Sequence, residues 1–287
     1  MTTHFNTRYA VHPDDYVRYD TQQLRKHFLV SGLFVPDEIN LTYTHYDRII
    51  VGGAAPVNKA LKLEAIDTLK SEFFLERREI GIINVGGAGA VSINGENHAL
   101  DCKEALYVGR GNESVIFSSV DPSNPARFYL NSTPAHTAYP VRKVGQNDAV
   151  VVELGAKETC NERTLRKLLV NDIIQTCQLQ MGMTDLKTGS VWNTMPPHTH
   201  SRRMEVYFYF EIPDDHAVCH FMGPSEEMRP VWIHNEQAVI SPPWSMHCGV
   251  GTANYTFIWG MAGENLDYGD MDFLTPLQLG IPKEEQS

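Results

Sequence analysis

Short segments with the residue pattern of β-strands recur along most of this 287-residue chain. Each segment alternates apolar and polar residues or is rich in β-branched and aromatic residues, and Gly, Pro, Asn or Asp follows soon after it. The expected strands are Ile80–Val85, Ala90–Ile93, Ser114–Ser118, Arg127–Leu130, Glu205–Phe210, Ala238–Ile240 and Tyr255–Trp259. Many short strands with frequent turns are typical of a sandwich or barrel, so we expect an all-β fold.

Helical periodicity is confined to three short stretches. Apolar residues recur at roughly helical spacing in Thr21–Leu29, Lys59–Ile66 and Glu162–Leu169. We expect a few short helices at these places, beside the β-strands.

Two stretches of the chain carry the same order of signals. A pair of arginines at 77–78 precedes one expected strand and a pair at 202–203 precedes another, an offset of 202 − 77 = 125. The segments that begin near Ala105 and Ala238 repeat at an offset of 238 − 105 = 133. Such self-similarity indicates a duplicated β unit. We expect one unit in residues 1–150 and the other in 151–287.

Four residues have the spacing of a metal site. His198 and His200 stand at i and i+2 in an extended segment, so both imidazoles lie on one face. Glu205 opens the next expected strand, and His247 follows a distant double proline. Three histidines and one carboxylate suit zinc, iron, manganese or nickel and leave room for water or substrate. The pattern predicts one divalent metal ion.

The alternative is a histidine-lined barrel without an ion, because a single histidine is more often a surface or core residue than a ligand. The repeat offers a contrast within the same chain. Its offsets place four other residues at the corresponding positions of the first unit: Phe73, Leu75, Ile80 and Ser114. Three of these are apolar, so we expect the first unit to keep the fold and to bind no metal.

The charge balance argues against a polyanionic partner. Thirty-five acidic residues stand against 24 basic ones, a formal charge of −11, and the sequence has no basic patch. We therefore expect no nucleic-acid partner. Without a long apolar run or a secretory signal, we expect no membrane segment and a cytoplasmic location. Five cysteines without a CxxC pair favour neither a disulfide framework nor a cysteine-rich zinc site.

Several longer strings resemble one enzyme family. They are HYDRIIVGG (45–53), FFLERREIGIINVGGAG (73–89), YPVRKV (139–144), WNTMPPHTHSRRMEVYFYF (192–210), HNEQAVISPPWSMHCGVG (234–251) and FIWGMAGEN (257–265). The chain is similar here to the 5-keto-4-deoxyuronate isomerases, also called 4-deoxy-L-threo-5-hexosulose-uronate ketol-isomerases, of the cupin superfamily.

The resemblance implies a bicupin of two jelly-roll β-barrels, assembled as a homohexamer. It also implies zinc held by His198, His200, Glu205 and His247. The implied reaction, in pectin and uronate degradation, converts the open-chain keto-uronate 5-dehydro-4-deoxy-D-glucuronate into 3-deoxy-D-glycero-2,5-hexodiulosonate. Two rival functions stay open. Iron at the same ligands suits a cupin oxygenase, and an inert site suits a non-catalytic sugar-binding cupin.

An aldose–ketose isomerase needs groups that move protons and a cation for the substrate carboxylate. The acid or base candidates are Tyr207, Tyr209, His136, His234 and Glu236. Each of them, taken singly, is more often a packing or orienting residue. Arg203 is the candidate for the carboxylate, because a guanidinium can bind it through two parallel hydrogen bonds. The alternative is that Arg203 pairs with an acidic residue of the chain itself.

Overall fold

The structure is a computed structural model that describes residues 3–282. The described chain is mostly β-strand, with two α-helices, which confirms the expected all-β class. It divides into two compact units, one of residues 3–8, 32–150 and 167–182, the other of 9–31, 151–166 and 183–282. The expected division at residue 150 stays a prediction. No helix in the described part is long and apolar enough to cross a membrane.

The first unit contains a larger sheet of order β1-β3-β4-β11-β6-β9-β12 and a smaller sheet of order β5-β10-β7-β8. The strands of the larger sheet are β1 (Thr3–Arg8), β3 (Ile39–Thr44), β4 (Ile50–Ala54), β6 (Arg78–Asn84), β9 (Ala105–Val108), β11 (Phe128–Pro134) and β12 (Arg142–Val144). Those of the smaller sheet are β5 (Leu61–Lys62), β7 (Gly89–Ile93), β8 (Glu96–Leu100) and β10 (Val115–Ser119). Apolar side chains from both sheets form one buried core, which includes Ile80, Ile82 and Phe117.

The larger sheet of the second unit has the order β13-β14-β15-β22-β17-β20-β2, and its smaller sheet the order β19-β18-β21-β16-β23. The larger sheet consists of β2 (Leu29–Val30), β13 (Val150–Leu154), β14 (Arg163–Leu169), β15 (Gln180–Leu186), β17 (Arg203–Phe210), β20 (Gln237–Ser241) and β22 (Thr256–Gly263). The first residue of β13, the last three of β14 and the first three of β15 are counted with the first unit. The smaller one consists of β16 (Trp192–Thr199), β18 (Val218–Gly223), β19 (Arg229–Ile233), β21 (Met246–Gly251) and β23 (Asp272–Phe273).

The strand order confirms the duplication. The sequence β4-β11-β6-β9 in one sheet corresponds to β15-β22-β17-β20 in the other. Ile80 pairs with Val108 on β9, and Glu205 pairs with Ser241 on β20. The differences, 205 − 80 = 125 and 241 − 108 = 133, are the two offsets expected from the sequence. Two units with the same ladder register therefore have different side chains at equivalent positions.

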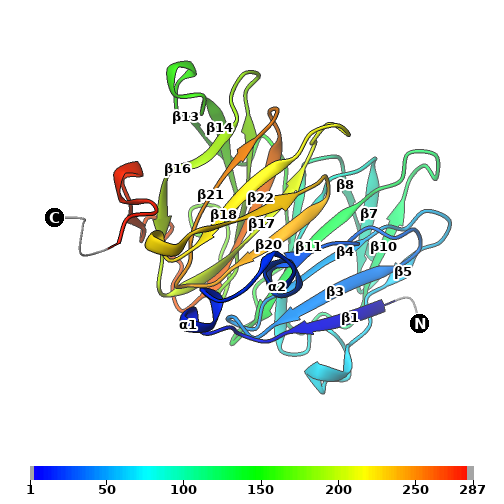
Figure 1. Ribbon diagram of the computed structural model, residues 1–287. Helices are drawn as coiled ribbons and strands as arrows, with labels where there is room; N and C mark the ends of the chain where they lie inside the picture. Colours follow the sequence, from blue (N-terminus) through cyan, green and yellow to red (C-terminus); the bar gives the residue numbers. More distant parts are fainter. Residues whose placement is uncertain (1–2, 283–287) are drawn as a thin grey trace. The chain divides into compact units, whose positions relative to one another are not determined.

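The N-terminal helices belong to the second unit. Helix α2 (Thr21–Phe28) confirms the expected helix, begins at a capping box between Asp20 and Gln23, and lies beside β20 (Figure 1). Helix α1 (Pro13–Tyr16) ends at a fully buried tyrosine, and the Tyr16 hydroxyl donates to the Met222 carbonyl at 2.7 Å. Residues 9–31 thus cover strands that lie 200 residues later in the chain.

Two of the expected helices were wrong. Lys59–Ile66 contains strand β5, in which Leu61 is buried and Lys62 exposed, and Leu63 is buried again. This short apolar run fits the two-residue period of a strand as well as a helical period. Glu162–Leu169 contains strand β14, since pairing within a sheet outweighs the weak helical preference of its residues.

Candidate metal centre

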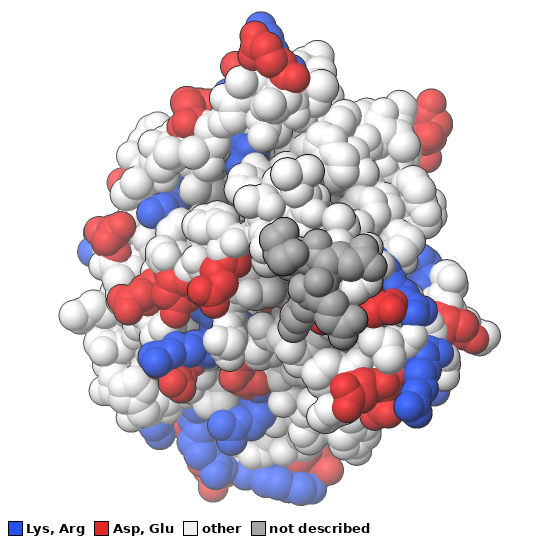
Figure 2. Space-filling view, turned by 60° about the vertical axis from the view of Figure 1, so that its left-hand side comes forward, with Lys and Arg blue, Asp and Glu red and all other residues white. Residues whose placement is uncertain are grey.

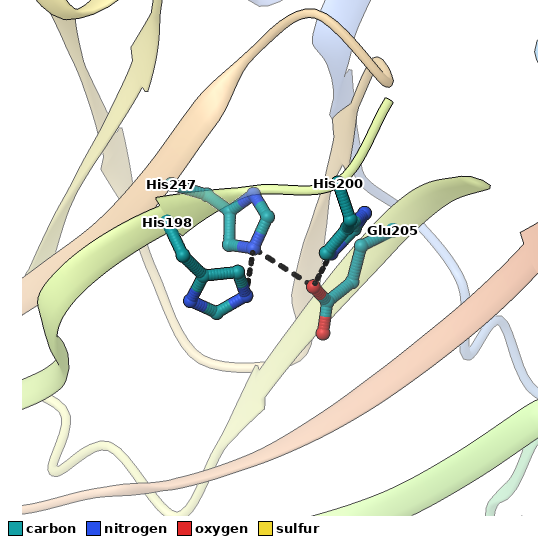
Figure 3. A group of neighbouring side chains, drawn as sticks. All are labelled: His198, His200, Glu205 and His247. Carbon is teal, nitrogen blue, oxygen red and sulfur yellow. Dashed lines mark hydrogen bonds and ion pairs between the residues drawn. The ribbon is translucent and has the colours of Figure 1, made fainter. Parts of the chain in front are cut away.

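The four predicted ligands lie together in the second unit (Figure 3). His198 is on β16, His200 directly follows that strand, Glu205 is on β17 and His247 on β21, where it pairs with His198. Their nitrogen and oxygen atoms all lie within 4.8 Å of one another, and this is the single such group found among residues 3–282. The group could hold a metal ion.

The side chains converge at hydrogen-bonding distance. The Oε2 atom of Glu205 is 2.8 Å from His247 Nε2 and 3.0 Å from His200 Nε2. The Nε2 atoms of His247 and His198 are 3.2 Å apart. In Figure 3 these atoms point toward a common centre. Three imidazole nitrogens and one carboxylate oxygen facing the same point are the donor set of a borderline divalent cation.

Burial controls the charge of this group. His198, His200 and Glu205 are at most 6% exposed and His247 is fully buried. Burial, with the neighbouring His247, lowers the pKa of His198 to about 2, so that imidazole is neutral. Burial opposes ionisation of Glu205, but the charge of His247 and hydrogen bonds from His200 and His247 hold its pKa below the usual range. The hydrogen bond and charge of Glu205 raise the pKa of His200 against the effect of burial. The group therefore combines an ionised carboxylate, the neutral imidazole of His198 and a proton held between His200 and Glu205, which a metal ion would displace on binding.

The outer nitrogens of two imidazoles are held by neighbouring groups. His200 Nδ1 lies 2.9 Å from the carbonyl of Arg203. His247 Nδ1 lies 3.1 Å from the hydroxyl of Ser241 and 3.3 Å from the carbonyl of Ser245. A carbonyl only accepts, so it holds a proton on Nδ1, and a bound metal ion would take the Nε2 lone pair in place of the present contact with Glu205. The residues present therefore fit a bound metal ion.

Strand β16 is irregular beside the centre. Its pairing with β21 shifts register between Asn193 and His198, as in a β-bulge. Within this stretch Thr194 has a φ of 47°, in the left-handed region that a β-branched residue rarely adopts. Its Oγ1 lies 2.9 Å from the Tyr207 hydroxyl. Backbone strain of this kind is held by its surroundings and is frequent near functional sites.

Two of the acid or base candidates share the face of β17 that bears Glu205. The Tyr207 ring is 5.2 Å from that of His247, while Tyr209 lies one step further along the strand and contacts His220. Burial, reinforced by the charge of Glu205, raises the pKa of Tyr207 well above its ordinary value. Tyr207 is therefore a neutral phenol at neutral pH, and its hydroxyl can donate a hydrogen bond.

The structure does not bring the other candidates to the group. His234 and Glu236 lie in the turn before β20. That strand pairs with β17 so that its first residue is opposite Tyr209 and its last opposite Glu205. The turn is consequently at the far end of β17, about 13 Å along the strand from Glu205. His136 is an exposed residue of the first unit.

Arg203 is 1% exposed and already has partners within the chain. Its Nη1 donates to the carbonyl of Asp267 at 2.9 Å and its Nη2 to that of Tyr268 at 3.1 Å, and Asp270 is 3.4 Å away. Arg78, at the equivalent place in the first unit, also donates to two backbone carbonyls. Both units therefore use this arginine to hold a backbone segment, and binding of a substrate carboxylate by Arg203 stays a prediction.

Three polar residues near the metal group were not predicted from the sequence. Thr194 and Ser241 gave no signal of their own, since their roles depend on a bulge and on the β17–β20 register. His220 could have been found, because Val218, His220 and Met222 alternate on one face of a strand and only the histidine among them is polar.

Comparison with known proteins gives a consistent family. Residues 31–274 match the KduI/IolB family. A 4-deoxy-L-threo-5-hexosulose-uronate ketol-isomerase of Formosa agariphila is 62% identical over 272 residues, covering 95% of this chain and 97% of the relative. The 4-deoxy-L-threo-5-hexosulose-uronate ketol-isomerase 1 of Bacteroides thetaiotaomicron is 59% identical over 273 residues, covering 95% and 98%.

Solved structures show the same fold at low identity. An IolB-like protein from Salmonella typhimurium superposes with a TM-score of 0.66 at 14% identity, over 79% of this chain and 87% of that one. Oxalate decarboxylase from Lactobacillus farciminis gives a TM-score of 0.55 at 10% identity, over 79% of each chain. These likenesses support the two-barrel, cupin-like architecture.

Proposed function

The chain belongs to the KduI/IolB family, and from this premise we propose that it is a metal-dependent 4-deoxy-L-threo-5-hexosulose-uronate ketol-isomerase. The observation that carries the proposal is the buried set of three imidazoles and one carboxylate whose ligand atoms converge within 4.8 Å. The substrate is the open-chain keto-uronate 5-dehydro-4-deoxy-D-glucuronate and the product is 3-deoxy-D-glycero-2,5-hexodiulosonate. The reaction belongs to pectin and uronate degradation.

We propose that His198, His200, Glu205 and His247 hold one zinc ion. The donor set supports zinc, and iron, manganese and nickel are the competing ions. When bound, such an ion supplies Lewis acidity that polarises a carbonyl group. The carbonyl and hydroxyl groups that fix the Nδ1 protons keep the imidazoles oriented toward it.

Isomerisation moves one hydrogen from C2 to C1 and one proton from the C2 hydroxyl to the C1 oxygen, so the site needs groups that accept and donate protons beside the reacting carbons. Tyr207 is the side chain in the best position, because its ring lies against His247 and its hydroxyl is fixed by Thr194. Its raised pKa keeps the proton on the phenol oxygen, so the hydroxyl can donate a hydrogen bond to a substrate oxygen. Burial of the whole group excludes bulk water from this step.

The wider proposal is a homohexamer located in the cytoplasm. On the face in Figure 2, acidic and basic side chains of the described residues lie interspersed, which supports a small-molecule substrate rather than a polyanion. The mass of the protein in solution, measured by light scattering, tests the hexamer. A stable smaller species would overturn that part of the proposal.

The test of function combines metal analysis with turnover. The protein is purified without added metal, its metal content is measured, and conversion of the keto-uronate is followed under anaerobic conditions. Zinc with oxygen-independent formation of the 2,5-diketo acid is the expected result. Iron with oxygen consumption would favour the cupin oxygenase instead. Binding of the sugar acid without turnover, with metal present or absent, would favour the sugar-binding cupin.

A further inference from the structure

A second polar layer lies inside the same barrel, next to the four ligands. Its centre is the Tyr209 hydroxyl, which is 2.7 Å from His220 Nδ1 and 3.4 Å from Asn193 Nδ2. All three side chains are fully buried. Asn193 also donates to the Tyr255 hydroxyl at 2.8 Å. None of these groups is needed to hold the metal.

Strand register places this layer directly beside the ligands. On β21 and β18, His247 pairs with Met222, and Gly249 pairs with His220. His220 is therefore two residues from the position opposite His247, on the same face of the sheet. The Tyr207 ring joins the two layers, at 5.2 Å from the ring of His247 and 5.5 Å from that of His220.

Two buried polar atoms in this layer have no hydrogen-bond partner among the described residues. They are Nε2 of His220 and Oδ1 of Asn193. An unpaired buried polar group is costly, and most buried polar groups of folded proteins are hydrogen-bonded. Both atoms belong to side chains whose other end is fixed at Tyr209, which leaves the free ends facing away from that hydroxyl.

The equivalent positions of the first unit are used differently. The offset of 125 places Ile82 and Asn84 at the positions of Tyr207 and Tyr209. Ile82 belongs to the apolar core, and both ends of the Asn84 amide are paired with backbone groups. In the second unit the polar layer is closely built around Gly249, because a Cβ at this position would lie 2.8 Å from Asn193 Nδ2 and 3.0 Å from the Tyr209 hydroxyl. The buried amide of the first barrel is thus fully paired, whereas the layer in the second barrel keeps two unpaired atoms.

We propose that His220 and Asn193 form a hydrogen-bonding wall that binds a hydroxyl or carbonyl oxygen of the open-chain sugar acid, with Tyr209 as the residue that positions both. A hydroxyl group donates and accepts, so a C–OH of the substrate can pair with either free atom. Loss of this contact discriminates against substrates without an oxygen at that carbon, since the wall is then left unpaired. The proposal rests on the proposed function. It assigns the residues that recognise an oxygen atom along the carbon chain of the sugar acid.

The sharpest variant is His220→Asn. The Asn amide reaches about as far as Nδ1 and keeps a partner for Tyr209, but it lacks the Nε2 end. His220→Gln places an amide nearer the Nε2 position and serves as the conservative rescue. His216→Asn is the matched control, because His216 belongs to the same unit and bonds Thr252 at 2.8 Å.

The measurements are metal content, kcat and KM, and the Kd of the substrate analogue whose C1 aldehyde is reduced to an alcohol. For His220→Asn we expect unchanged metal content and a loss of about tenfold in both kcat/KM and analogue affinity, corresponding to roughly one hydrogen bond. His220→Gln should recover part of this loss, and His216→Asn should behave as wild type. If His220→Asn does not fold, Asn193→Ser tests the same wall with the same expectation.

Wild-type values of kcat/KM and Kd in His220→Asn, or in Asn193→Ser where that variant replaces it, would overturn the proposal while the isomerase function stands. A wild-type protein that binds the analogue but does not turn over the keto-uronate would overturn the proposed function alone. Loss of metal from His220→Asn would also overturn the proposal, because it would make His220 a support of the metal centre.

Discussion

His198 and His247 face each other across β16 and β21 with their Nε2 atoms 3.2 Å apart. Replacing either by Ala removes one of four ligand atoms, so we expect most bound metal and activity to disappear. The fold should survive, because both barrels keep their apolar cores. Metal analysis and circular dichroism of His198→Ala and His247→Ala check this, with His216→Ala as control. Full metal occupancy in both variants would refute the ligand assignment.

The role of Tyr207 in proton transfer can be tested by removing its hydroxyl alone. Tyr207→Phe keeps the ring contact with His247 and removes the hydroxyl that Thr194 holds. We expect kcat to fall by about 10²-fold or more, as for loss of a positioned acid, with KM and metal content nearly unchanged. An unchanged kcat would show that another group donates the proton, or it would favour direct migration of hydride from C2 to C1. Deuterium at product C1 after turnover in D₂O would argue against hydride migration.

A conservative substitution of Arg203 distinguishes a structural role from a substrate-binding role. Arg203→Lys keeps the charge but cannot bond the carbonyls of Asp267 and Tyr268 together. We expect the free energy of unfolding to fall by about 1–3 kcal/mol, because buried carbonyls lose a partner. Urea denaturation measures it. If stability stays at the wild-type value while KM rises more than kcat falls, the guanidinium binds the substrate carboxylate as the sequence predicted.

Residue spacing predicted the metal group but not its support. The i, i+2 spacing of His198 and His200 and the position of Glu205 at a strand start are local properties, so sequence alone reveals them. The hydrogen bond from His247 to Ser241 is not local, because it needs the register of β17 against β20. The same holds for Tyr209 and His220, which come from separate sheets.

At the scale of elements, helix α1 covers the strand that pairs with the one bearing His247. Tyr16 is fully buried, its ring lies 5.2 Å from that of Trp244, and its hydroxyl binds the carbonyl of Met222, the residue paired with His247. Arg229 adds hydrogen bonds to two carbonyls of the residues just after α1. The N-terminal segment is thus part of the wall of the second barrel.

Tyr16→Ala should therefore destabilise the protein by about 3–5 kcal/mol, as expected when a large buried aromatic side chain is removed. Tyr16→Phe should cost less, about 1–3 kcal/mol, because it only leaves the Met222 carbonyl unpaired. Urea unfolding measures both, and Tyr9→Phe, at a position 70% exposed, is the control. Wild-type stability of Tyr16→Ala would show that the segment does not support this barrel.

Strand elements were easier to predict than the segments between them. The expected strands at Ile80–Val85 and Glu205–Phe210 match β6 and β17 closely, since long alternating runs of β-branched and aromatic residues have one plausible period. Short runs such as 59–66 fit two periods, and the neighbouring strand decides between them. Strand β16 could not be predicted from its pattern, because its bulge interrupts the alternation.

The duplication gives the molecule two barrels that share strand order and register but differ in their interior side chains. In the first unit the position of Glu205 is taken by Ile80, within a continuous apolar core. In the second unit the corresponding interior carries the four ligands and the layer around Tyr209. The difference between the two interiors could be predicted because both offsets are visible in the sequence. The placement of residues 9–31 on the second unit could not be predicted, because it leaves no local signal.

Metal should consequently titrate to one ion per chain. Apoprotein made with a chelator is titrated with zinc, and both calorimetry and elemental analysis after gel filtration report the number bound. We expect one site, because the first barrel presents isoleucine and leucine side chains where the second presents imidazole and carboxylate. In His247→Ala this single tight site should vanish, which separates it from weak binding by surface acids. A second tight ion that persists in His247→Ala would place a further ligand set outside the group, and the assignment of an apolar, metal-free interior to the first barrel would then be wrong.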